Sequence, residues 1–191
     1  MVIAYKKQED IRLTKARIRN TILLRLKAQK AEDRIRKSAV ISRKLFKTRS
    51  FKQAKIIMFY KSFRGEVDTE EMIKLAQRIG KIVVVPVCDT NKTMIPCVLK
   101  RTARLLRGPY GILEPAVKKA IDINLIDLVI VPGVAFTKDG KRLGRGKGFY
   151  DRFLSKLPIE IPSIGLGFKC QILPDLPTAK YDVNIQKVIF A

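Results

Sequence analysis

The sequence contains no histidine and no tryptophan in 191 residues. Without histidine, the chain cannot build a Ser-His-Asp or Cys-His nucleophile system, and it has no imidazole to bind a metal. Proton transfer or metal binding must therefore use carboxylates, Lys, Tyr, Cys or backbone groups. A metal bound by this set would be a hard ion with oxygen ligands.

Cysteines and long apolar runs are also scarce. The chain has three cysteines, Cys88, Cys97 and Cys170, and no two of them form a CxxC motif. An odd number cannot all pair in disulfides within the chain, which favours a reducing compartment over a disulfide-stabilised secreted protein. The N-terminus has no apolar signal-peptide core, and no run of about 18 apolar residues occurs. We therefore expect a cytoplasmic protein without a membrane partner.

Acidic residues are few relative to basic ones. Lys and Arg number 40 against 17 Asp and Glu, which gives a formal charge of +23. A charge far above the magnitude of about 2 to 8 usual for a small domain favours polyanionic partners, namely nucleic acid, an anionic membrane or phosphorylated small molecules. Residues 1–55 hold 18 basic and 4 acidic side chains, so the basic character is concentrated at the N-terminal end.

No glycine or proline occurs before Gly65, so the first 55 residues can be helical almost throughout. Apolar residues repeat at helical spacing in two stretches, with Ile11, Ile18, Ile22 and Leu26 in the first, and Ala39, Val40 and Phe46 in the second, at 34–47. We expect two basic helices.

Beyond residue 55 the pattern changes to short apolar runs separated by helices and turns. Strands are predicted at 56–60, at 82–87 with a partner at 94–99, at 125–132, and in two terminal runs, 163–168 and 183–190. Asp68 or Thr69 is expected to cap a helix with an apolar face of Met72, Leu75, Ala76 and Ile79, and another helix is predicted at 148–157.

Continuous apolar strands that alternate with helices predict an α/β fold. We expect a three-layer α/β/α sandwich with a largely parallel sheet, preceded by the basic N-terminal helical segment. The length suits a single domain over residues 1–191, with the helices of residues 1–50 packed on the α/β core.

A glycine-rich loop lies between the predicted strand at 125–132 and the helix at 148–157. Glycines at alternate positions are combined with cations, in the order Arg142, Gly144, Arg145, Gly146, Lys147 and Gly148. Such glycines permit positive φ and let backbone N–H groups approach a ligand. The loop therefore predicts an anion site for phosphate. Its spacing matches neither a P-loop nor a dinucleotide fingerprint, and a surface loop with solvated charges is the alternative.

Several residues near this loop keep structural alternatives open. Asp151, in the first turn of the predicted helix, either stabilises the helix dipole or holds magnesium beside phosphates. Asp182 precedes the last strand as a turn residue or a functional carboxylate. Glu66, at the loop end of the first strand, is a ligand contact or a solvated residue. The Gly108–Pro115 segment is interpreted as a structural turn.

The segment from Gly140 to Arg152, GKRLGRGKGFYDR, closely resembles the signature of the 5-formyltetrahydrofolate cyclo-ligase family, also called methenyltetrahydrofolate synthetases. The resemblance extends over nearly the whole chain, through 15–19, 62–69, 108–115, 127–132 and the turn at Asp182. Five further segments in the same order are far more specific than one glycine loop.

This resemblance implies ATP- and magnesium-dependent cyclisation of 5-formyltetrahydrofolate to 5,10-methenyltetrahydrofolate, with release of ADP and phosphate. The implied path passes through a phosphorylated formyl group, an imidate, on whose carbon N10 of the folate then closes. Phosphoryl transfer needs positioning and charge neutralisation more than a protein nucleophile, so a site without histidine is sufficient. The excess positive charge would then steer ATP and a polyglutamylated folate inward.

The resemblance also implies roles for individual positions. ATP is expected to contact Lys15, Arg19, Arg142, Leu143, Gly144, Arg145, Gly146, Lys147, Gly148, Phe149 and Tyr150. The folate is expected to contact Lys61, through its backbone, together with Glu66, Arg145, Gly146, Lys147, Gly148 and Phe149. The expected catalytic residues are Arg145 and Lys147, and the expected magnesium ligands are Asp151 and Asp182.

Three positions depart from the family pattern. Tyr181 stands where many members have histidine, Gln186 where they have a second acid, and Phe149 where tyrosine is common. We expect the core chemistry to survive if Asp182 alone is the magnesium-linked residue of its turn.

A second function class follows from the charge alone. A non-enzymatic nucleic-acid-binding protein would use the basic N-terminal helix to bind phosphate backbones through counterion release. The chain shows no recognised RNA- or DNA-binding motif, and few aromatic residues lie among the charges. We therefore favour the cyclo-ligase, and expect a monomer without a specific nucleic-acid partner.

Overall fold

The structure is a computed structural model that describes residues 2–89 and 93–191. A six-stranded sheet with the order β10-β9-β6-β1-β2-β3 forms its centre. The strands are β1 (Ile56–Met58), β2 (Ile82–Cys88), β3 (Met94–Val98), β6 (Leu128–Val131), β9 (Ser163–Gly167) and β10 (Lys187–Phe190). Every neighbouring pair is parallel except β2 with β3, which is antiparallel. The predicted largely parallel sheet, with 94–99 paired to 82–87, is confirmed.

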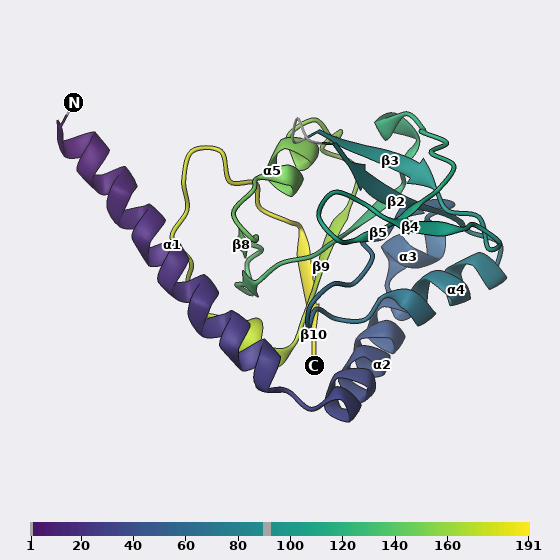
Figure 1. The fold of residues 1–191 in the computed structure, drawn as a ribbon, viewed down its shortest axis with the longest axis horizontal. Coiled ribbons are helices and arrows are strands. Elements are labelled where there is room, and N and C mark those ends of the chain that lie inside the picture. The colour runs from purple at the N-terminus through teal and green to yellow at the C-terminus, as the bar shows by residue number, and fades with distance from the viewer. Residues whose placement is uncertain (1, 90–92) are drawn as a thin grey trace.

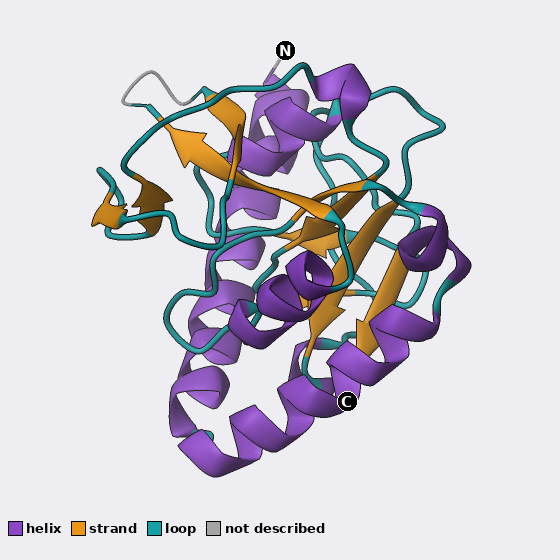
Figure 2. Cartoon of the chain, turned by 90° about the vertical axis from the view of Figure 1, so that its right-hand side faces the viewer, coloured by secondary structure: helices purple, strands orange, loops and turns teal. Residues whose placement is uncertain are grey.

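Two layers of helix cover this sheet (Figure 2). The helices are α1 (Val2–Ala28), α2 (Ala31–Lys47), α3 (Arg49–Gln53), α4 (Glu70–Arg78) and α5 (Phe149–Leu154). Alternate residues of β2 point to opposite faces, with Val83 and Val85 in one apolar cluster and Val84 in another. Helices α1 to α4 contribute buried residues to the first cluster and α5 to the second. The α/β/α sandwich is therefore confirmed.

The N-terminal helices share the main core. Ile22 and Leu26 of α1 are each 1% exposed and pack in the same cluster as Ile41 of α2 and Leu128 of β6. Burying such side chains stabilises the fold by roughly 1.5–3 kcal/mol each. This packing supports the prediction that residues 1–50 dock on the α/β core. Figure 1 shows α1 beside the chain that leads from η2 (Lys169–Gln171) to β10.

The buried faces of two other helices differ from the prediction. In α2 the buried residues are Ser38, Ile41 and Leu45, whereas Ala39 is exposed. Ser38 is buried because its hydroxyl accepts a hydrogen bond from Asp68 N at 3.0 Å. Hydrophobicity alone does not reveal such a tertiary contact.

In α4 the buried face is Met72, Ile73 and Ala76, so the predicted face was wrong for Leu75 and Ile79, which are exposed. Thr69 is the N-cap residue, but its hydroxyl donates to Tyr60 O at 2.6 Å.

Several predicted elements are shorter in the structure, and the largest differences occur in three of them. The run at 125–132 begins with a 3-10 turn, η1 (Ile123–Leu125), because Asp122 accepts a hydrogen bond from Asn124 N. The last strand starts only at Lys187, since Ile185 N is bonded to Gly140 O instead of to the sheet. Helix α5 ends at Leu154, four residues before Pro158.

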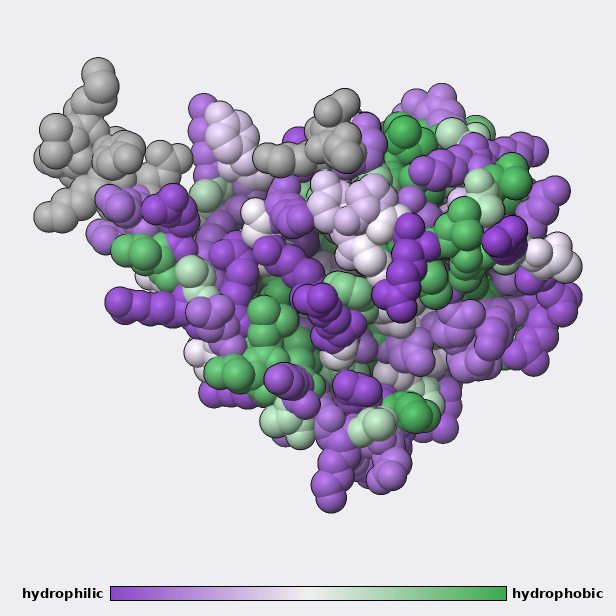
Figure 3. All heavy atoms as spheres, viewed as in Figure 1, coloured by the Kyte–Doolittle hydropathy of each residue, from purple (hydrophilic) through white to green (hydrophobic). Residues whose placement is uncertain are grey.

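Two small antiparallel ladders lie beside the main sheet: β4 (Leu105–Arg107) with β5 (Leu113–Pro115), and β7 (Ala135–Phe136) with β8 (Arg142–Leu143). The β4–β5 turn and the loop between β8 and α5 carry residues of the site described below. Hydrophilic side chains cover most of the face seen in Figure 3. Among the described residues, none of the helices combines the length and apolar character that a membrane span requires.

Candidate functional site

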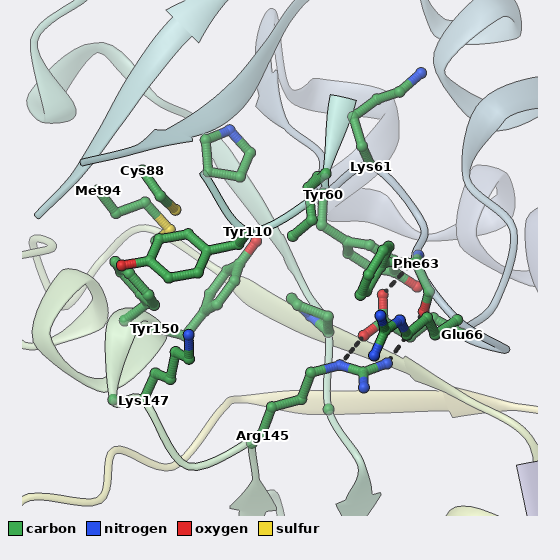
Figure 4. A pocket seen from close by; sticks show the side chains of 18 of the residues that line it. Tyr60, Lys61, Phe63, Glu66, Cys88, Met94, Tyr110, Arg145, Lys147 and Tyr150 are labelled. Atoms are coloured by element: carbon green, nitrogen blue, oxygen red, sulfur yellow. Dashed lines mark hydrogen bonds and ion pairs between the residues drawn. The ribbon is translucent and has the colours of Figure 1, made fainter. Parts of the chain in front are cut away.

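A cavity of about 450 Å³ opens at the carboxyl ends of β1, β2 and β6. Parallel α/β sheets place ligands at this edge, where the chain leaves neighbouring strands in opposite directions. The lining comes from the segment after β1, the β2–β3 pair, the β4–β5 turn and the glycine loop before α5. Figure 4 shows side chains from these segments converging on the cavity.

Much of the cavity wall is apolar or aromatic. The wall includes Tyr60, Phe63, Pro86, Met94, Pro109, Tyr110, Ile112 and Phe149. The hydroxyl of Tyr60 donates to Val67 O at 3.0 Å, so this residue offers its ring rather than its hydroxyl to the cavity. Such a wall suits a planar organic ligand.

The glycine loop borders the cavity through Gly144 and Gly148. Gly148 has φ +67 and Gly146 has φ +97, so two of the three alternating glycines use the left-handed backbone that disfavours other residues. At Gly144 the constraint is space instead, because an added Cβ would lie 2.8 Å from Nη1 of Arg142.

Arg142 and Asp151 form a largely buried ion pair at the two ends of this loop. Nη2 of Arg142 donates to Oδ1 of Asp151 at 2.7 Å, with side-chain exposures of 3% and 21%. The same oxygen accepts a longer bond, 3.4 Å, from Val183 N. Nε of Arg142 is buried without a hydrogen-bond partner among the described residues. The pair fixes the start of α5 and leaves one guanidinium donor unused.

Arg145 connects the glycine loop to the segment after β1. Its Nε donates to Oε1 of Glu66 at 3.1 Å and its Nη2 donates to Phe63 O at 3.1 Å (Figure 4). Oε2 of Glu66 accepts from Phe63 N at 3.0 Å. Burial raises the pKa of Glu66, while Arg145 opposes the rise. Arg64 sits beside this contact with φ +46, a strained conformation for a residue other than glycine.

Lys147 is held by an aromatic ring. Its Nζ lies 4.0 Å from the ring centroid of Tyr110, and the ring of Phe149 meets Tyr110 edge-on at 5.1 Å. The Gly108–Pro115 segment, predicted as a structural turn, contributes Tyr110 and the buried Glu114 to the cavity lining, two residues that the sequence does not identify as part of the site. The sequence does contain one indication of their role, because residues 108–115 are one of the segments that resemble the cyclo-ligase family.

The α1 side of the glycine loop carries a separate group of charges. Nε of Arg19 donates to Gly144 O at 2.8 Å, and Lys15 forms an ion pair with Asp182. Burial lowers the pKa of Arg19, and the nearby Asp182 and Asp151 oppose the shift. These contacts bring four predicted residues, two cations and two carboxylates, to one place.

Not every predicted residue offers its side chain to the cavity. Leu143 is 2% exposed in the hydrophobic core, which leaves only its backbone for a ligand. Lys61 lies on the lining, but its side chain points away from the cavity and pairs with Glu70 of α4 (Figure 4). This geometry agrees with the expectation that Lys61 acts through its backbone.

Asp151 and Asp182 supply the oxygen donors for a possible metal. Among the residues that the structure describes, no group of three or more acidic, histidine or cysteine side chains is placed to hold an ion. Magnesium usually uses one or two protein carboxylates and completes its shell with waters and substrate phosphates. The pair therefore fits magnesium bound together with a nucleotide.

Two further cavity groups stay protonated. Burial raises the pKa of Cys88 to about 11, so its thiol is a poor nucleophile at neutral pH. Burial also raises the pKa of Tyr150, whose hydroxyl is buried without a hydrogen-bond partner among the described residues.

Comparisons with known proteins agree with one another. A model of the 5-formyltetrahydrofolate cyclo-ligase family matches residues 11–191. The 5-formyltetrahydrofolate cyclo-ligase of Mus musculus is 30% identical over 91% of both chains, and that of Haemophilus influenzae is 35% identical over 72% of this chain and 76% of its own. A solved structure of Aquifex aeolicus 5,10-methenyltetrahydrofolate synthetase has a TM-score of 0.82 at 27% identity, covering 92% of this chain and 89% of its own.

Proposed function

The chain belongs to the 5-formyltetrahydrofolate cyclo-ligase family, and from this premise we propose that it converts 5-formyltetrahydrofolate to 5,10-methenyltetrahydrofolate at the expense of ATP. The observation that carries this proposal is the position of the glycine loop. One side of the loop borders an aromatic cavity, and on the other side Lys15 and Arg19 of α1 meet Asp182 and the loop's Gly144 O.

The cavity is proposed to hold the folate. Its aromatic wall fits the flat pterin ring, and its volume of about 450 Å³ lies in the usual range for small-molecule sites. Two guanidinium groups lie near the Phe63 ring, with Arg64 at 4.8 Å and Arg145 at 5.6 Å from its centroid. The Arg145 contact places this wall of the cavity beside the glycine loop.

The nucleotide is proposed to lie along the loop on the α1 side, within reach of Lys15 and Arg19. The formyl oxygen then attacks the γ-phosphorus, the bond from that phosphorus to the β-bridging oxygen breaks, and ADP leaves. N10 closes on the formyl carbon and loses its proton, and the carbon–oxygen bond breaks as phosphate departs. No protein atom becomes covalently attached, which is consistent with a histidine-free chain and with the protonated Cys88 thiol.

The protein's contribution is then charge and position. Arg145 and Lys147 face the transferring phosphate in this proposal, where fixed cations stabilise charge that develops in the transition state. Burial in a partly dry cavity strengthens such interactions relative to water.

Magnesium, in this proposal, would be held by Asp151 and Asp182 together with phosphate oxygens. When bound it would polarise the phosphoryl group and neutralise part of its charge. Each carboxylate is already oriented by a cation, Arg142 for Asp151 and Lys15 for Asp182. These ion pairs hold the donors in place before the nucleotide arrives.

We further propose, on the basis of composition, that the enzyme works as a cytoplasmic monomer on a polyglutamylated folate. The formal charge of +23 would attract a polyglutamate tail. If this is correct, kcat/KM for a polyglutamylated substrate falls as ionic strength rises, and an unchanged value contradicts steering.

The test of the function is direct. Purified protein is incubated with 5-formyltetrahydrofolate, ATP and Mg²⁺, and formation of methenyltetrahydrofolate is followed by its absorbance. We expect product only when both ATP and Mg²⁺ are present, with one ADP released for each product molecule. A folded protein that binds both substrates without forming product would contradict the proposal.

A further inference from the structure

The cations that surround the glycine loop have two kinds of partner. Arg142 and Arg145 each pair with a carboxylate, and on the α1 side so does Lys15. Lys147 takes part in no ion pair within the described part of the chain, and its ammonium instead lies 4.0 Å from the centroid of the Tyr110 ring.

Tyr110 is itself fixed from a different part of the fold. Its hydroxyl donates to Asp89 O at 3.3 Å, just beyond β2. The turn that carries it is closed by bonds from Gly108 N to Ile112 O at 2.8 Å and from Gly111 N to Gly108 O at 2.9 Å. The edge-on contact with Phe149, at 5.1 Å, ties the same ring to the first residue of α5. The ring is therefore held on several sides.

We propose that Tyr110 is a positioning residue that holds the Lys147 ammonium at the cavity with its positive charge unneutralised. This inference rests on the proposed function. It adds an explanation of why the β4–β5 turn places an aromatic residue, Tyr110, at the cavity.

The physical argument concerns what a phosphate meets on arrival. A carboxylate partner would offset the charge of Lys147, and an incoming phosphate would have to displace it. A ring quadrupole attracts the ammonium while adding no net charge. The flexible four-carbon stem of lysine loses much of its freedom in this position before binding, which reduces the entropy that the reaction step must overcome.

The experiment replaces Tyr110 by phenylalanine and then by phenylalanines with one, two and three ring fluorines. Fluorine withdraws electrons from the ring face and weakens cation binding, but changes the shape of the ring little. We expect kcat/KM to fall in steps with fluorination. Tyr110→Leu, which has no ring, should lower kcat/KM by roughly 5- to 30-fold. Tyr110→Phe should retain most of the activity.

The matched control is the same series in a Lys147→Met background. If Tyr110 acts through the ammonium, the dependence on fluorination disappears there. An equal dependence in both backgrounds would overturn the proposal, because the ring would then act on the folate directly. A series that is flat with Lys147 present would also overturn it, since only packing would remain.

A second measurement does not depend on activity. In protein labelled with 13C-lysine, the ε-methylene protons of Lys147 should be shifted upfield by the Tyr110 ring current. The shift should persist in Tyr110→Phe and vanish in Tyr110→Leu. An unshifted wild-type signal, assigned with Lys147→Met, overturns the positioning role. A shifted signal in a protein that forms no methenyltetrahydrofolate would instead refute the proposed function alone.

Discussion

The two sides of the glycine loop are built from different chemistry. On the cavity side, rings such as Phe63 and Tyr110 dominate, and loop cations lie against them. On the α1 side, Lys15 and Arg19 meet carboxylates and backbone oxygens. The difference indicates a division of labour, in which one side recognises a planar ring and the other a polyphosphate with its metal. The loop between them would bring the two reacting atoms together.

The largest expected effect comes from replacing Lys147, a cation of the cavity side. Lys147→Met should lower kcat by about 100- to 1,000-fold, the usual loss when a group that stabilises transition-state charge is removed. Steady-state rates measure this, with Lys138→Met as the matched control, because Lys138 is an exposed lysine in the β7–β8 turn. Equal activity of the two variants would contradict a role for Lys147 in the reaction.

The next largest effect is expected from replacing Asp151, a carboxylate that lies between the two sides. Asp151→Asn should raise the Mg²⁺ concentration needed for half-maximal rate by roughly 10- to 100-fold, as for loss of a metal-site partner. It should also lower the free energy of unfolding by about 3 kcal/mol, because Arg142 is left buried without its partner.

Asp175→Asn is the control for this change. Asp175 pairs with Lys141 at 2.6 Å but is 74% exposed, so its loss should cost less than about 1 kcal/mol. Metal titration and urea unfolding separate the two effects. An unchanged magnesium requirement in Asp151→Asn would remove its assigned metal role.

Asp151 and Lys147 also show how much of the site the sequence could predict. The glycine loop, its cations and Asp151 are close in sequence, so their spacing and the family resemblance identify them together. Tyr110 reaches Lys147 from a separate hairpin, and a contact between distant segments leaves no local pattern. Of the aromatic wall, Phe149 and Tyr150 were therefore predicted with the loop, whereas Tyr60, Phe63 and Tyr110 were missed.

The fold shows the same division between local and distant effects. Ile22 and Leu26 are buried as their helical spacing predicts. In α2 the predicted Phe46 packs against the core, but Ala39 is exposed and Ser38 is buried, where a hydrogen bond from Asp68 N, far along the chain, stabilises it. In α4, Ile73 is buried against the sheet and Ile79 is exposed. Apolar periodicity alone does not distinguish these two residues.

A smaller effect is expected from the contact that joins the glycine loop to the segment after β1. Burial raises the pKa of Glu66 above its ordinary value, so this carboxylate takes up a proton at a higher pH than an exposed glutamate. Protonation removes the negative charge that Arg145 faces, and kcat/KM should therefore fall as the pH is lowered through that pKa. In Glu66→Gln this acid limb should disappear from the pH profile. A limb at the same pH in the variant would assign the titration to another group.

The smallest effect on the reaction is expected at Lys61. Its side chain pairs with Glu70 outside the cavity, so Lys61→Met should lower the free energy of unfolding by about 1 kcal/mol and leave kcat/KM nearly unchanged. Thermal unfolding and initial rates measure the two quantities. A large rise in KM for the folate would show that the side chain, rather than the backbone, contacts the substrate.

The division between the two sides is tested most directly by comparing one variant from each. Arg19→Gln removes the α1-side donor to Gly144 O, and Phe63→Leu removes a ring from the cavity side. Initial rates with both substrates varied should show a raised KM for ATP in the first variant and a raised KM for 5-formyltetrahydrofolate in the second, with the other constant nearly unchanged in each case. If Arg19→Gln raises the folate KM as much as the ATP KM, the two sides do not bind different substrates, and the account is wrong.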